Sequence, residues 1–251
     1  MEFEAHLAGQ SLSQMWTVNV HPRDEIVQRA DGGFFKNLYG WVGIDLLNTT
    51  SEGMNEHGLT ASAQTFRGSQ YQSQEQGYKA VYSLNMVPWL LGNFKSVDEV
   101  VAALGDVRIV QGPESFEKLS PGSTHNHWTI VDKDGRRIIL EYVKGLPQVH
   151  NDTVGIFTND PVYDFHLQNV NQYAFLSDQW PSDLGEFTAQ TEVGTVPQVV
   201  GHGFNLRGLP GDYSPASRFI RMFYLKQFST RSAPPADETA AIEIVTGINP
   251  P

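Results

Sequence analysis

The dipeptide Asp134-Gly135 constrains this sequence more than any other feature, because Asp-Gly between two alternating segments is one of the strongest signals for a tight β-hairpin. Apolar and polar residues alternate before it, over residues 128–132, and after it, over residues 137–142. The two segments are therefore predicted to pair antiparallel, and the fold is predicted to contain a sheet built from hairpins.

Further segments have the composition of strands. Residues 14–20 alternate and are predicted to end at His21-Pro22, because proline cannot donate to a strand ladder. Residues 38–47 and 59–66 are predicted to form two strands joined by the turn-rich segment 49–58. One more strand is predicted over residues 154–157.

Helices are predicted between these strands. Residues 80–110 are predicted to be helical, with a second helix opening at Ser96, because Ser96 and Glu99 have the spacing of a capping box. Ser214-Pro215 begins a strong helix over residues 215–227, and helices are also predicted over residues 165–175 and 236–244.

A single compact domain over residues 1–251 is the expected organisation, since the length and the 40% hydrophobic content suffice for one large core. Its strands are joined by hairpins and interleaved with helix pairs. That pattern predicts an α+β fold of mixed sheets covered by helices.

The net charge of −11, from 28 acidic and 17 basic side chains, makes nucleic acid and anionic membrane surfaces poor partners. No apolar run is long enough to predict a membrane span. The absence of cysteine excludes a disulfide, a thiolate zinc site and a thiol nucleophile within these residues. His125 and His127 have a spacing that suits a metal on a strand, but no supporting ligand lies at a suitable interval, so no metal is predicted.

Four ordered segments resemble the choloylglycine hydrolase family, the family of bile salt hydrolases and penicillin V acylases within the N-terminal-nucleophile hydrolases. They are residues 53–59, residues 87–99, residues 158–161 followed by Gln168, Asn169 and Tyr173, and residues 208–219. This resemblance implies a four-layer αββα sandwich, and it implies that the printed sequence is a fragment cut at both ends.

The resemblance also implies the chemistry, which is hydrolysis of a linear carbon–nitrogen amide by an N-terminal cysteine whose own α-amine acts as base. An α-amine titrates near pH 8 and a thiol near 8.5, so the pair can exchange a proton close to neutrality. The expected partner is a small N-acyl amide, no cofactor is implied, and relatives often form homotetramers. The cysteine itself is expected shortly before Met1.

Four residues of this sequence match functional positions of the family. Glu2 takes the place of an acidic residue that orients the amino end of the nucleophile, although aspartate is the more familiar residue there. Asn159 matches the oxyanion-hole asparagine, and Arg218 matches an arginine that stabilises the thiolate and the transition state. Thr65 falls where relatives carry an asparagine or tyrosine whose backbone donor completes the oxyanion hole.

Two other functions are consistent with these residues. Since the sequence holds no cysteine, the protein could be a catalytically inactive homologue that binds small molecules in the same pocket. An unrelated hydrolase using Glu2 or Glu4 with a histidine is a weaker alternative. For an active enzyme, bile salts, penicillin V and N-acyl homoserine lactones all fit the family, and Thr65 favours aliphatic or aromatic acyl amides over bile salts.

Overall fold

The chain divides by its internal contacts into two compact units, Met1–Tyr163 and Asp164–Pro251, and each is described by itself. The prediction of one domain over the whole chain stays a prediction. The computed structural model describes residues 6–7, 10–11, 16–46, 49–119, 122–152, 154–178, 187–191, 194–198 and 206–229.

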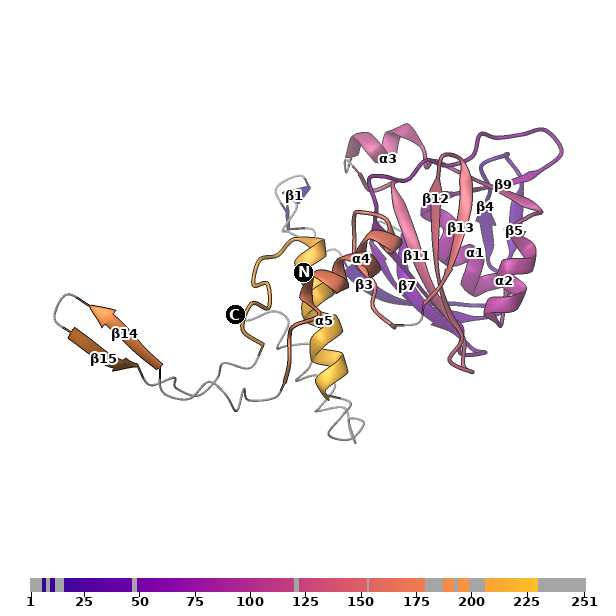
Figure 1. Ribbon diagram of the computed structural model, residues 1–251. Helices are drawn as coiled ribbons and strands as arrows, with labels where there is room; N and C mark the ends of the chain where they lie inside the picture. Colours follow the sequence, from indigo (N-terminus) through magenta and orange to yellow (C-terminus); the bar gives the residue numbers. More distant parts are fainter. Residues whose placement is uncertain are drawn as a thin grey trace. The chain divides into compact units, whose positions relative to one another are not determined.

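A seven-stranded sheet dominates the first unit, with the order β13-β12-β11-β8-β7-β6-β3 (Figure 1). All six neighbouring pairs in this sheet are antiparallel. The strands are β3 (Trp16–His21), β6 (Trp41–Leu46), β7 (Thr49–Asn55), β8 (Thr60–Thr65), β11 (Asn126–Val131), β12 (Arg137–Val143) and β13 (Leu146–Asn151).

The hairpin predicted around Asp134-Gly135 is confirmed. β11 and β12 pair with Trp128 opposite Leu140, and Gly135 has a φ of 83°, a value that favours glycine. The strand predicted to end at His21-Pro22 is also confirmed, since β3 ends at His21.

The segment predicted as a turn, residues 49–58, is mostly a strand, so that prediction was wrong. Its first seven residues form β7, which pairs with β6 on one side and β8 on the other. Glycine is needed at position 53 of β7, because a Cβ atom there would lie 2.5 Å from the Val42 carbonyl oxygen and 2.9 Å from Leu91. Only Asn55 to Leu59 form the turn, in which the Asn55 side chain accepts from two backbone N–H groups.

Residues 80–110 contain the two predicted helices, α1 (Met86–Asn93) and α2 (Val97–Ala103). The ends of that range were predicted wrongly, because β9 (Lys79–Tyr82) and β10 (Val107–Val110) pair in parallel on either side of the helices. The Ser96 hydroxyl caps α2 by accepting from Glu99 N, while the Glu99 carboxylate accepts from Lys95 N. A 3-10 turn, Ser83–Asn85, leads from β9 into α1.

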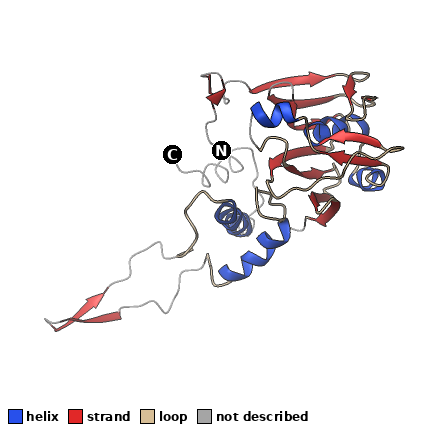
Figure 2. Cartoon of the chain, turned by 90° about the horizontal axis from the view of Figure 1, so that it is seen from above, coloured by secondary structure: helices blue, strands red, loops and turns tan. Residues whose placement is uncertain are grey.

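The main core lies between the large sheet and helix α1, which contacts β7 and β8 (Figures 1 and 2). Leu90, Leu91, Trp128 and Tyr142 are all completely buried there. The opposite face of β3, β6 and β7 instead exposes apolar residues, namely Val18, Val20, Val42 and Met54.

The strand predicted over residues 154–157 is absent from the described residues of that range, so this prediction was also wrong. Asp152 prevents it, because its Oδ1 accepts from Val154 N and Gly155 N and turns the chain away from the sheet. The edge of the sheet is formed by β13 instead.

Smaller elements complete the first unit. β4 (Ile26–Gln28) and β5 (Phe34–Lys36) form a short antiparallel pair, as do β1 (His6–Leu7) and β2 (Gln10–Ser11). Helix α3 spans Glu114–Leu119 and precedes β11.

The second unit contains the predicted helix α5 (Pro215–Ser229), whose Ser214 hydroxyl accepts from Ser217 N at its start. It also holds most of α4 (Tyr163–Val170), a 3-10 turn (Asn171–Tyr173), and the hairpin of β14 (Phe187–Thr191) and β15 (Gly194–Gln198). Leu176, Ile220 and Tyr224 form its buried core. The helix predicted over residues 236–244 lies outside the described residues.

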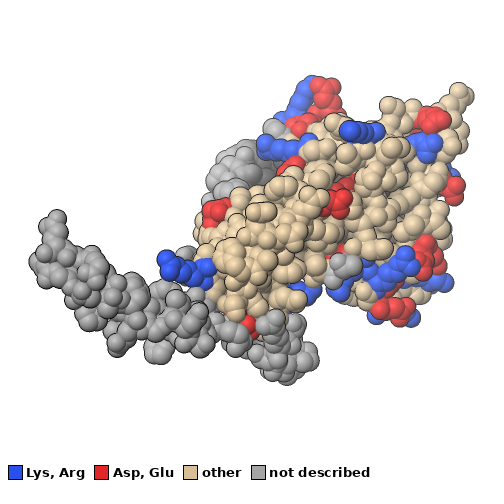
Figure 3. Space-filling view, viewed as in Figure 1, with Lys and Arg blue, Asp and Glu red and all other residues tan. Residues whose placement is uncertain are grey.

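Charged side chains are dispersed over the surface. In the face shown in Figure 3, blue and red groups lie close together around the edge of the first unit, and most of the area between them is uncharged. Within the described part of the chain, no helix is both long and apolar enough to cross a membrane.

Replacing Gly53 with alanine tests the close packing of β7. We expect Gly53→Ala to lower the free energy of unfolding by roughly 1–3 kcal/mol, because the added methyl overlaps backbone that cannot move aside. Gly105→Ala is the matched control, since a Cβ there meets nothing within 4 Å. Urea unfolding of both variants measures the difference, and equal stabilities would contradict this packing.

Candidate active site

Asn159 and Thr65 lie in contact although 94 residues separate them. Thr65 ends β8, and Asn159 lies in the segment between β13 and α4. The Asn159 side-chain Nδ2 donates to the Thr65 carbonyl oxygen at 3.0 Å. This hydrogen bond uses one of the two hydrogens of the amide and fixes the orientation of the side chain.

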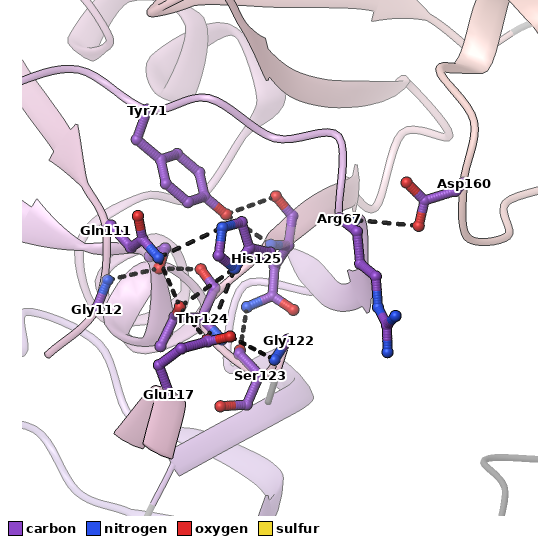
Figure 4. A network of polar contacts seen from close by, with 12 residues as sticks. Arg67, Tyr71, Gln111, Gly112, Glu117, Gly122, Ser123, Thr124, His125 and Asp160 are labelled. Carbon is purple, nitrogen blue, oxygen red and sulfur yellow. Dashed lines mark hydrogen bonds and ion pairs between the residues drawn. The ribbon is translucent and has the colours of Figure 1, made fainter. Parts of the chain in front are cut away.

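Asp160 holds the same two segments together through the backbone. Its Oδ2 accepts from Arg67 N at 3.0 Å, and its Oδ1 accepts from Gly68 N at 3.0 Å. Figure 4 shows the Asp160 carboxylate facing the Arg67 backbone while the guanidinium of Arg67 extends away from it. Gly68 is needed here, because a Cβ would lie 2.9 Å from the Phe66 ring.

Glu117 orders the loop before β11 (Figure 4). Its carboxylate accepts from Gly122 N and from the Thr124 hydroxyl, each at 2.6 Å. Burial would raise the pKa of Glu117, but these hydrogen bonds outweigh it and lower the pKa below its ordinary value. A Cβ on Gly122 would lie 3.9 Å from the Thr65 methyl, so this ordered loop borders Thr65.

A buried polar cluster on β11, β12 and β13 lies beside this site, and the sequence did not predict it. Glu141 is completely buried and its Oε1 lies 2.8 Å from His127 Nδ1, while Tyr163 N donates to the same carboxylate. His150 Nε2 lies 3.5 Å from the other carboxylate oxygen. The available signal was Glu141 itself, a charged residue in the middle of the apolar strand Arg137–Val143.

The two histidines considered for a metal do not act together. His127 contacts Glu141 within the sheet, whereas His125 contacts Thr124 and Gln111 in the loop before it (Figure 4). Among the described residues, no group of three or more candidate ligands could hold a metal ion.

Arg218 lies in the first turn of α5, in the second unit. Its guanidinium is partly buried, and burial lowers its pKa, with a further contribution from the nearby charge of Arg221. Arg221 is itself held by the carbonyl oxygens of Pro210 and Asp212. Glu2 lies outside the described residues. The roles predicted for Glu2 and for Arg218 both stay predictions.

A rigidly held amide N–H can stabilise negative charge that develops on an oxygen, which is a main requirement of acyl transfer. The donor at Asn159 is fixed by Thr65, and its loop is fixed by Asp160. The described residues therefore contain an oriented side-chain amide at Asn159, whose catalytic role stays a prediction, and they contain no thiol nucleophile, since the sequence has no cysteine.

The comparisons with known proteins agree with this fold. The structure is similar to a conjugated bile acid hydrolase from Clostridium perfringens, with a TM-score of 0.78, 30% identity, and coverage of 93% of this chain and 71% of that one. It also resembles penicillin V acylase from Agrobacterium tumefaciens in fold, with a TM-score of 0.67 and 21% identity over 93% of this chain and 63% of that one. The fold is therefore the α+β fold of the N-terminal-nucleophile hydrolases.

The sequence comparisons identify the family. Residues 8–247 match the family model described as linear amide C-N hydrolases, choloylglycine hydrolase family. A bile salt hydrolase/transferase of Clostridium perfringens is 38% identical over 232 residues, which cover 88% of this chain and 68% of the relative. One from Bifidobacterium longum is 34% identical over 68% of this chain, a region that spans 51% of that relative. The chain belongs to the choloylglycine hydrolase family.

Asp160→Ala tests the tie between the two site segments. It removes both acceptors for Arg67 N and Gly68 N, so we expect the free energy of unfolding to fall by about 1–3 kcal/mol. Glu114→Ala is the control, because Glu114 is exposed and forms a surface ion pair with Lys118. Urea unfolding compares the two, and a loss no larger than that of the control would contradict the tie.

The acid stability of the protein tests the Glu141 cluster. Burial alone would raise the pKa of Glu141, but hydrogen bonds from His127, His150 and Tyr163 N lower it from 4.5 to about 2. Because the folded pKa is depressed, its contribution is complete above pH 4.5 and is lost as the pH falls toward 2. We expect Glu141→Gln to lose stability near neutrality and to show a flatter decline over this range, measured by urea unfolding at each pH. Parallel pH curves for variant and wild type would contradict the assignment.

Proposed function

We propose that the protein hydrolyses the carbon–nitrogen bond of a linear N-acyl amide, with Asn159 stabilising the oxyanion. The supporting observation is the Asn159–Thr65 hydrogen bond, which orients the side-chain amide of the residue whose motif resembles that of the family's oxyanion-hole asparagine. The relatives are named for hydrolysis of conjugated bile acids, which are themselves linear amides.

The nucleophile that the family resemblance implies is a cysteine thiolate, and it is not among these 251 residues, which contain no cysteine. The thiolate attacks the amide carbonyl carbon, and the carbonyl oxygen becomes an oxyanion that accepts from Asn159. Collapse of this intermediate breaks the C–N bond, and the departing nitrogen takes the proton held by the α-amine. Water then cleaves the acyl-thioester to release the carboxylic acid and regenerate the thiol.

The family resemblance implies roles for three further residues. The Thr65 carbonyl orients Asn159, and its own backbone N–H is the second oxyanion donor that the family resemblance implies. Arg218 stabilises the thiolate by its charge, and Glu2 orients the α-amine by a charge-assisted hydrogen bond.

Aliphatic or aromatic N-acyl amides are the proposed substrates, because Thr65 replaces the asparagine or tyrosine of relatives. A direct assay is a panel of conjugated bile salts, penicillin V and N-acyl homoserine lactones with the full-length protein. Faster cleavage of the bile salts than of the other amides would reverse this preference.

One observation favours a second candidate, a binding protein without catalysis: the sequence contains no cysteine. If the protein starts at Met1, it should bind N-acyl amides, measured by calorimetry, and should release no amine. A cysteine encoded just upstream of Met1, together with amine release by the full-length protein, would exclude this candidate.

Asn159 variants test the oxyanion role. Asn159→Ala should lower kcat at least a hundredfold with little change in KM, because a donor to the oxyanion acts mainly in the transition state. Asn159→Asp should lose more, since it places an acceptor and a negative charge where the oxyanion forms. Asn151→Ala, on the exposed end of β13, is the control and should keep wild-type kcat. Wild-type kcat in Asn159→Ala would refute the assignment.

A further inference from the structure

His127 is a buried imidazole placed between two phenylalanine rings. Only 1% of its surface is exposed. The Phe66 ring stacks on it with centroids 4.7 Å apart, and the Phe157 ring lies 4.4 Å away. The imidazole therefore sets the spacing between the two phenylalanines.

Glu141 fixes the orientation of this imidazole. The carboxylate lies opposite His127 in the β11–β12 ladder, and its Oε1 is 2.8 Å from His127 Nδ1. Because the carboxylate also accepts from Tyr163 N at 3.0 Å, it is held from the far side as well. The ring thus has one orientation in which Nδ1 donates to Glu141.

Both phenylalanines are adjacent to the Asn159–Thr65 contact in sequence. Phe66 directly follows Thr65, and Phe157 precedes Asn159 by two residues. Phe66 is 1% exposed and is also covered by Gly68, so its ring has little room to move. A change in ring spacing at His127 would therefore shift the Thr65 carbonyl relative to the Asn159 amide.

A buried histidine is energetically unfavourable if its side chain only fills space. Its Nε2 is buried and has no hydrogen-bond partner among the described residues. A buried, unsatisfied polar nitrogen costs about 1–3 kcal/mol, which an apolar side chain of similar size would avoid. A histidine at this position is explained if the fixed plane of its ring is needed to position the two phenylalanine rings.

We propose that His127 is a positioning residue: oriented by Glu141, its ring spaces Phe66 and Phe157 so that Asn159 is held on the Thr65 carbonyl in the geometry that receives the oxyanion. The catalytic part of this inference rests on the proposed function. The geometric part does not, because it concerns the Asn159–Thr65 contact alone.

The test uses His127→Asn in the full-length protein. The asparagine amide keeps an N–H donor near Glu141 but removes the ring from between the phenylalanines. We expect kcat to fall at least tenfold with KM within about twofold of wild type, and a crystal structure should show the Asn159–Thr65 hydrogen bond lost.

His150→Asn is the matched control. His150 also contacts Glu141, but its ring lies against Tyr163, with centroids 5.7 Å apart. If the cluster served stability alone, both variants would lose stability and neither would lose kcat. We expect His150→Asn to keep kcat within about twofold and to keep the Asn159–Thr65 bond.

Phe157→Leu is a second test of the same inference, because it removes one of the two aromatic rings that contact His127 and leaves Glu141 unchanged. We expect Phe157→Leu to lower kcat as His127→Asn does. If His127→Asn does not fold, Phe157→Leu provides the test. Wild-type kcat in the variant, or an Asn159 amide still bonded to the Thr65 carbonyl, overturns the proposal. If the wild type cleaves no amide, the proposed function fails, while the variant crystal structures still decide the role of His127.

Discussion

The buried carboxylate of Glu141 is the constraint on which the site depends. A completely buried anion must be surrounded by donors, because its desolvation is otherwise too costly. The donors come from neighbouring strands and from Tyr163 N at the start of α4. The chain between β13 and α4 must therefore return to this end of the sheet. Asn159 and Asp160 lie in that returning segment, so the position of the candidate oxyanion donor depends on the hydrogen bond from Tyr163 N to Glu141.

The sequence predicted elements whose signals are local. The Asp134-Gly135 hairpin and helix α5 are both specified by neighbouring residues, and both are confirmed. β7 was missed because Thr49–Asn55 lies between two strands and under α1, where a small residue such as Gly53 serves better than an alternating apolar pattern. β9 and β10 were missed because a parallel pair joined through two helices leaves no turn signal between its strands.

The site was predictable only in part, for a related reason. Asn159 and Thr65 could be named because each lies in a segment that resembles the family, and the structure brings them into contact. Asp160 and His127 could not be assigned roles, because these depend on Arg67 N, 93 residues away, and on the two phenylalanine rings. Asn-Asp-Pro alone predicts a turn, and a histidine on an apolar strand alone predicts a core residue.

The way the site is built explains why two functions share it. In acyl transfer, much of the rate enhancement comes from donors that are oriented before the reaction begins, and this orientation is independent of the nucleophile. Here Thr65 and Asp160 hold Asn159 and its loop through contacts that lie entirely within the first unit. In the proposed function, the Asn159 amide receives the acyl carbonyl oxygen whether or not a thiol is present. Under that proposal the cysteine decides between hydrolysis and binding, whereas the contacts that orient Asn159 lie within the residues described.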